Sequence, residues 1–121
     1  MDYWILAASG LSALIFFVHL IGGGKDVHVP MLESGMSQIL KAYASVIWHA
    51  ISAILGIGSV AFLWAAMGHG DGIAVVIAVQ YLAFAGLFLA YGVTRLNSIW
   101  VMPQWSAFLL ISGLAGVGLW N

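Results

Sequence analysis

Apolar side chains fill four long segments of this chain, at residues of about 3–21, 37–67, 72–94 and 103–120. A helix needs roughly 20 apolar residues, at about 1.5 Å of rise each, to cross the hydrocarbon core of a bilayer. Each segment is close to that length or longer, and none shows the short polar–apolar alternation of a membrane β-barrel. The pattern therefore predicts an all-α fold, an integral membrane four-helix bundle that forms one transmembrane domain over residues 1–121.

Small and polar residues mark the expected ends of these helices. The first segment reaches three consecutive glycines at residues 22–24, which disfavour a continuing helix. Ser37 is a suitable N-cap for the second segment, and Pro103 suits the first turn of the fourth. Residues 22–36 are therefore expected to form a loop.

The composition agrees with a lipid environment and excludes several classes of function. Hydrophobic residues make up 64% of the chain and charged residues only 6%, whereas a soluble domain is about a quarter charged. A net charge of −1 with three basic residues gives no electrostatic basis for binding nucleic acid. The absence of cysteine excludes disulfides, thiolate-held iron–sulfur clusters and a cysteine nucleophile.

The few charged residues predict the orientation in the membrane. If the four helices cross alternately, Lys25, Lys41 and Arg95 all lie on one side, while Asp2 and Asp71 lie on the other. Lysine and arginine near helix ends are retained in the cytoplasm. We therefore expect a multi-pass protein of the bacterial inner (cytoplasmic) membrane, with both the N and C termini on the non-cytoplasmic side.

Small and hydrogen-bonding residues recur at helical spacing inside the apolar segments. The second segment carries such a stripe at Ser45, His49, Ser52, Gly56 and Ser59, and the fourth carries Gly113 and Gly116. Spacings of three and four place these residues on one side of a helix. Because close packing and hydrogen bonds hold helices together in lipid, the stripes indicate helix packing, within a compact bundle or against another copy or a larger partner.

Two histidines, His19 and His49, lie within the apolar segments, where an ionisable group is rare and suggests function. One hypothesis is axial ligation of haem b by this pair. Counting residues from the cytoplasmic end places them about 5 Å and about 12 Å deep, so the second helix would have to tilt. A second hypothesis adds His28, with Asp26 and Glu33 nearby in sequence, to form a zinc or copper site.

Other interpretations need no cofactor. His49 could be hydrogen-bonded inside the bundle, with Gln80 of the third segment as its polar partner, and the same two residues near the midplane could serve a small transporter. Ser45, His49 and Ser52 share one helix face, but no acid orients the imidazole. No catalytic residue is therefore assigned, and the sequence disfavours an enzyme.

The segment VHLIGGGKDVHVPML at residues 18–32, followed by Trp48-His49, resembles a functionally uncharacterised group of small four-helix bacterial inner-membrane proteins. That group has a histidine before a glycine loop, a downstream proline element and a Trp-His pair. The resemblance covers the first half of the chain and implies no activity or ligand. It implies that one local arrangement contains His19, Gly22, Gly23, Asp26, Pro30, Trp48 and His49.

The leading functional hypothesis is a non-enzymatic membrane protein, an accessory or structural subunit of a membrane complex or a homo-oligomer. It rests on the small-residue stripes, the short loops and the lack of a catalytic set. The lipid bilayer and other membrane subunits, or further copies of the chain, are the expected partners. A haem b- or metal-binding protein is the alternative, and a small transporter is a weaker one.

Overall fold

The computed structural model describes all 121 residues and contains only helices. They are α1 (Tyr3–Val18), η1 (His19–His28), α2 (Val29–Glu33), α3 (Gln38–Ala66), α4 (Asp71–Arg95) and α5 (Gln104–Trp120). Three continuous helices, Tyr3–Glu33, Gln38–Ala66 and Asp71–Arg95, are long and apolar enough to cross a membrane, and α5 is a shorter apolar helix. The all-helical fold and the four-helix pattern predicted from the apolar segments are thereby confirmed.

The first helix does not end at the glycine triplet, so the predicted loop at 22–36 is wrong. The chain continues from α1 through η1 and α2 to Glu33, and η1 is a π-helix. Only residues 34–37 separate α2 from α3. Glycine lowers helix stability without forbidding the conformation, and packing of the Trp48 ring against Gly23 supports the helix at this point.

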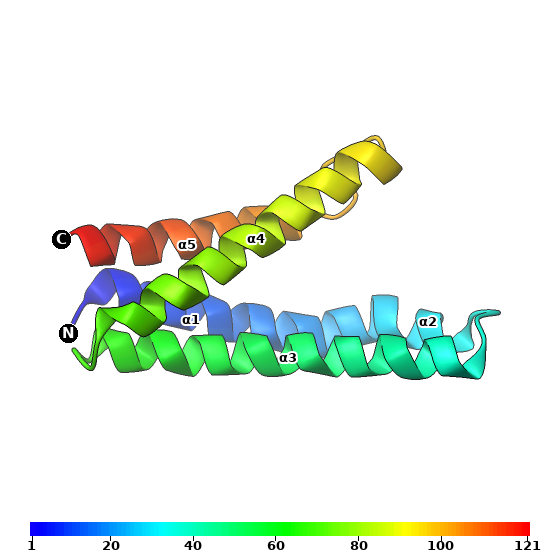
Figure 1. Ribbon diagram of the computed structural model, residues 1–121, viewed down its shortest axis with the longest axis horizontal. Coiled ribbons are helices and arrows are strands. Elements are labelled where there is room, and N and C mark those ends of the chain that lie inside the picture. Colours follow the sequence, from blue (N-terminus) through cyan, green and yellow to red (C-terminus); the bar gives the residue numbers. More distant parts are fainter.

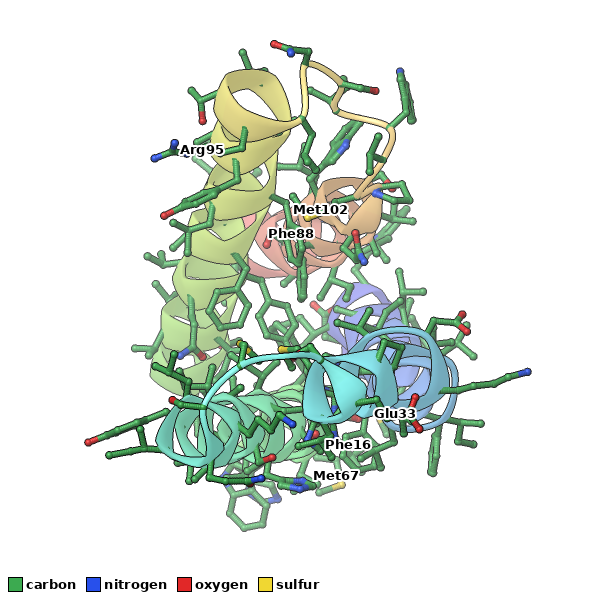
Figure 2. All side chains as sticks on the ribbon, turned by 90° about the vertical axis from the view of Figure 1, so that its right-hand side faces the viewer. Phe16, Glu33, Met67, Phe88, Arg95 and Met102 are labelled. Carbon is green, nitrogen blue, oxygen red and sulfur yellow. The ribbon has the colours of Figure 1, made fainter.

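The helices divide into a long hairpin and a second, splayed pair (Figure 1). The connected helix α1–η1–α2 runs antiparallel to α3, while α5 lies beside α1 and α4 crosses the hairpin and diverges from it. The end-on view shows α4 leading away from the hairpin toward Arg95, with Phe88 on its side facing α5 (Figure 2). Both termini lie at the same end of the molecule (Figure 1).

Burial follows this arrangement. The core is formed by Ile5, Ala8, Leu55, Ala61, Phe62, Ala65, Ala66, Ala74, Ile77, Ala78, Tyr81, Ala85, Phe108, Ile111 and Ala115. Neither η1 nor α2 contains a buried residue, and the buried residues of α3 begin at Ser52. We call η1, α2 and residues 38–51 of α3 the arm, because this part of the hairpin extends beyond the four-helix core (Figure 1).

Tyr81 is at the centre of the core. Its ring is fully buried and makes edge-to-face contacts with Phe62 and Phe108. Its hydroxyl shares a 2.7 Å hydrogen bond with the Ser12 hydroxyl of α1. The ring lies directly over Gly58, where an added Cβ would be 2.5 Å from the tyrosine oxygen. Tyr81 of α4 thus contacts all three of the other long helices, and α3 can approach it only with glycine at position 58.

The small-residue stripe of α3 faces α1. The Ser9 hydroxyl donates to the Ser59 carbonyl at 2.8 Å, and the Ser59 hydroxyl donates to the Ser9 carbonyl at 3.0 Å. A Cβ added to Gly56 would be 3.3 Å from the Phe16 ring, and Ser52 is buried. Reciprocal hydrogen bonds and close approach of this kind stabilise helix pairs in lipid.

The α5 stripe does not face the bundle. Gly113 and Gly116 are exposed, and a Cβ added to either would meet nothing within 4 Å. α5 instead packs through Phe108, Ile111, Ser112, Ala115 and Gly118, and the Ser112 hydroxyl donates to the Ala78 carbonyl at 3.0 Å. Gly113 and Gly116 therefore do not pack inside the bundle, because hydrogen bonding and aromatic contacts place a neighbouring face of α5 there. Packing of the two glycines against another copy or a larger partner stays a prediction.

Candidate functional site at the histidine–tryptophan stack

Two of the predicted site histidines enclose the Trp48 indole in the arm. The His19 ring stacks on the indole at 4.1 Å between centroids, with an angle of 17° between the planes. The His28 ring is also nearly parallel to the indole, at 5.4 Å and 8°. Between the two histidines, Gly23 meets the outer edge of the indole, where an added Cβ would be 3.0 Å from Cη2. We call His19, Trp48 and His28 the His–Trp stack.

The π-helical conformation of η1 is what places both histidines on one side. In an α-helix, 3.6 residues make a turn, so side chains nine positions apart point in nearly opposite directions. In a π-helix the hydrogen bonds join residues five positions apart, and each turn is wider, with about four residues or a little more per turn. Two such turns separate His19 from His28, and Gly23 lies one turn from each. Trp48 of α3 therefore inserts between them.

Hydrogen bonds hold the stack to α3. Nε2 of His19 lies 3.4 Å from the Trp48 carbonyl oxygen, which also accepts a 3.1 Å hydrogen bond from the Ser52 hydroxyl. Nε2 of His28 shares a 3.0 Å hydrogen bond with the Ser45 hydroxyl. Ser45 and Ser52 of the predicted stripe thus contact the histidine site as well as the helix interface. No carboxylate hydrogen-bonds to His28, so the Ser45–His28 pair lacks the acid that orients a catalytic imidazole.

His49 lies at the outer edge of this site. Its exposed ring is edge-on to His28, with 5.4 Å between centroids and an interplanar angle of 87°. Gln80 does not reach His49. Tyr81, the next residue of α4, contacts Gly58, and Gly58 lies nine residues beyond His49 on α3, about 13 Å away at the helical rise. The predicted polar partner of His49 is therefore not brought to it, because α4 diverges from the arm (Figure 1).

The structure places His19 and His49 at similar positions along the long axis of the hairpin, but the candidate ligand side chains do not converge on one metal position. His19 stacks on Trp48, the residue immediately before His49. The difference in membrane depth expected between His19 and His49 is therefore absent, because the first helix continues past the glycines. No group of three or more histidine, aspartate or glutamate side chains converges as a metal site requires. Asp26 and Glu33 are exposed. Haem b ligation by His19 and His49, and a metal site that includes His28, remain predictions.

No protein-family model, curated protein or solved structure matches this chain. The resemblance to small inner-membrane proteins therefore remains a prediction. All the residues it links lie in the arm, and among them His19 and Gly23 contact Trp48. The sequence contained a signal for this arrangement that periodicity at 3.6 residues misses: three glycines lie between two histidines nine positions apart, a spacing that only a wider helix places on one face.

Proposed function

We propose that the chain is a multi-pass integral protein of the bacterial inner membrane with a role in assembly. It acts as an accessory or structural subunit of a membrane complex, or as a homo-oligomer, and not as an enzyme. The observation that carries the proposal is that α4 and α5 each expose a face of small residues on the outside of the bundle. The core of the bundle is built from other residues of these helices.

The membrane part of the proposal is supported by helix length, surface and charge. Three helices are long and apolar enough to cross a bilayer, and large hydrophobic side chains cover much of the surface. α5 has 17 residues, about 26 Å at the helical rise, which a modest thinning of the bilayer accommodates. η1, the start of α3 and the end of α4 lie away from the end of the molecule that holds the termini and the α3–α4 turn (Figure 1). The first three segments carry Lys25, Lys41 and Arg95, whereas Asp2 and Asp71 begin α1 and α4, which supports cytoplasmic placement of the basic end.

The assembly part is supported by what the exposed faces can do in lipid. On α4, Ala83, Gly86 and Ala90 are exposed, and on α5 Gly113 and Gly116 are exposed. A Cβ added at any of these three glycines would meet no atom within 4 Å. Small residues let the backbones of two helices approach closely, which is a principal source of helix association in a bilayer. A helix of a second copy or of another subunit fits these faces better than lipid chains do.

The experiment that tests this role fills the α5 face. We expect Gly113→Leu combined with Gly116→Leu to abolish the larger complex that the wild-type chain forms in mild detergent, because the added side chains keep the partner helix away. The measurement is cross-linking in isolated membranes, followed by native mass spectrometry of the purified protein.

The matched control enlarges exposed apolar side chains on another helix. Ile57→Phe with Val60→Leu in α3 changes side chains that are also exposed, and we expect the complex to persist. The unfolding midpoint of the monomer should be unchanged in both double variants. A complex that survives the glycine substitutions, or a wild-type chain that is monomeric and has no partner in native membranes, contradicts the proposed role.

A further inference from the structure

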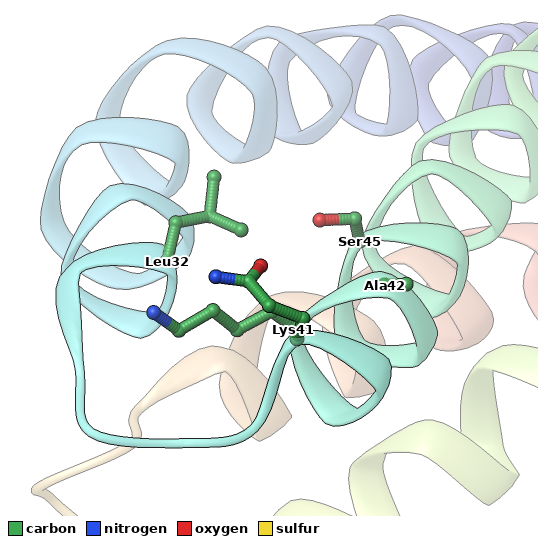
Figure 3. Close-up of a pocket in the computed structure, with 5 residues that line it drawn as sticks. Leu32, Lys41, Ala42 and Ser45 are labelled. Carbon is green, nitrogen blue, oxygen red and sulfur yellow. The ribbon is translucent and has the colours of Figure 1, made fainter.

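A groove lined by both polar and apolar residues lies at the far end of the arm, between α2 and the start of α3 (Figure 3). It has a volume of about 370 Å³ and is lined by Leu32, Gln38, Lys41, Ala42 and Ser45. The Lys41 and Ser45 side chains are directed toward the hollow, opposite Leu32 (Figure 3). The groove is separate from the exposed faces of α4 and α5 on which the assembly role rests.

The lining favours an anion. The Lys41 ammonium, the Gln38 amide and the Ser45 hydroxyl can all donate hydrogen bonds, and no carboxylate lines the groove. Hydrogen bonds from an ammonium to a phosphate oxygen are charge-assisted and stronger than neutral ones. The Ser45 hydroxyl also shares a hydrogen bond with His28, so the groove adjoins the His–Trp stack. Leu32 gives one wall an apolar surface.

The position of the groove along α3 corresponds to the headgroup layer. Lys41 and Ala66 are 25 residues apart on this continuous helix, a separation of about 38 Å at the helical rise. The hydrocarbon core is about 30 Å thick, and the headgroup regions extend the bilayer to about 40–45 Å. With Ala66 at one boundary of the core, Lys41 lies beyond the opposite boundary, among lipid phosphates.

We propose that this groove binds a phosphate-bearing anion, through Lys41 with Gln38 and Ser45. The two possible sources are the headgroup of an anionic phospholipid and free inorganic phosphate. Juxtamembrane lysines attract anionic headgroups by about 1 kcal/mol each. Several hydrogen-bond donors in one groove also fix where the phosphate group binds. The headgroup source rests on the proposed placement of the chain in a bilayer.

The test compares two lysines of the same arm. The full chain, purified in neutral detergent, is titrated with short-chain phosphatidylglycerol and the bound lipid is counted by native mass spectrometry. We expect Lys41→Gln to weaken binding about fivefold, as the loss of one lysine near a headgroup implies. Lys25→Gln removes the same charge from η1, outside the groove lining, and should leave binding nearly unchanged. Lys41→Arg should retain it, and Gln38→Leu should weaken it.

Two further arms identify the source of the phosphate. Preference for phosphatidylglycerol over zwitterionic phosphatidylcholine, with no displacement by inorganic phosphate, assigns the headgroup. Displacement by inorganic phosphate, with no preference between the lipids, assigns the free anion to the same groove. Equal losses in Lys41→Gln and Lys25→Gln, or no loss in either, overturn the proposal. Complex size, measured on the same samples, reports separately on the assembly role.

Discussion

Tyr81→Ala is expected to lower the free energy of unfolding by about 3–5 kcal/mol, the range for removing a large aromatic side chain from a packed core. The ring is fully buried against Phe62 and Phe108, and its hydroxyl is hydrogen-bonded to Ser12. The substitution therefore leaves a cavity where α1, α3, α4 and α5 meet. Unfolding in mixed micelles with increasing dodecyl sulfate, followed by far-ultraviolet circular dichroism, measures the effect.

The matched control is Tyr91→Ala in the same helix, since Tyr91 is 56% exposed. We expect it to change the unfolding free energy by less than about 1 kcal/mol, as for most surface positions. Tyr81→Phe should fall between the two variants, because it keeps the ring but leaves the Ser12 hydroxyl with only a long hydrogen bond to Leu55, at 3.5 Å. Equal effects at positions 81 and 91 would show that the core is elsewhere.

Gly23→Leu is expected to dismantle the His–Trp stack and to destabilise the arm by about 1–3 kcal/mol, the usual cost of overpacking. An added Cβ alone would be 3.0 Å from the Trp48 ring, so a branched side chain must displace the indole from between His19 and His28. In a chain that keeps Trp48 and has its other tryptophans replaced by phenylalanine, this displacement changes the fluorescence emission of the remaining indole.

Gly24→Leu serves as the control, because a Cβ at position 24 meets nothing within 4 Å. Both variants replace a glycine of the same triplet in η1, so they share any general effect on helix propensity. We expect only the variant at position 23 to shift the emission and lower the stability. If the two variants behave alike, Trp48 does not pack on Gly23 and the π-helical register of η1 is wrong.

Most helix boundaries could be predicted from the sequence. Ser37 caps α3 as its position suggests, and its side chain accepts a hydrogen bond from the Leu40 amide. The ends of α4 and α5 lie within a residue or two of the expected positions. These boundaries follow from local chemistry, since hydropathy sets helix length and a side chain near the terminus satisfies free amides.

The predicted helix end at the glycine triplet is wrong because local propensity does not decide the conformation of residues 22–24. Glycine permits a helix end and also permits another chain to approach the backbone closely. In this protein Gly23 allows the Trp48 ring to approach the backbone and does not end the helix, and residues 19–28 form a π-helix. That contact joins positions 25 residues apart in sequence, and no periodicity within one helix predicts it.

The orientation of helix faces was only partly accessible from the sequence. Spacing correctly grouped Gly56 and Ser59 of α3, and the structure places both against α1. The same reasoning grouped Gly113 and Gly116 of α5, yet those residues face outward. Spacing shows which residues share a face, whereas the neighbour that covers the face depends on contacts between helices, such as the hydrogen bond from Ser112 to Ala78.

Thiol labelling tests most directly the proposal that the chain crosses a membrane with its basic end in the cytoplasm. The chain has no cysteine, so single substitutions give unambiguous reporters. Gly35→Cys lies between α2 and α3, and His69→Cys lies between α3 and α4. With a membrane-impermeant maleimide on intact spheroplasts, we predict that Cys at position 69 reacts at once and Cys at position 35 reacts only after permeabilisation. The reverse pattern, or reaction of both before permeabilisation, would contradict the account.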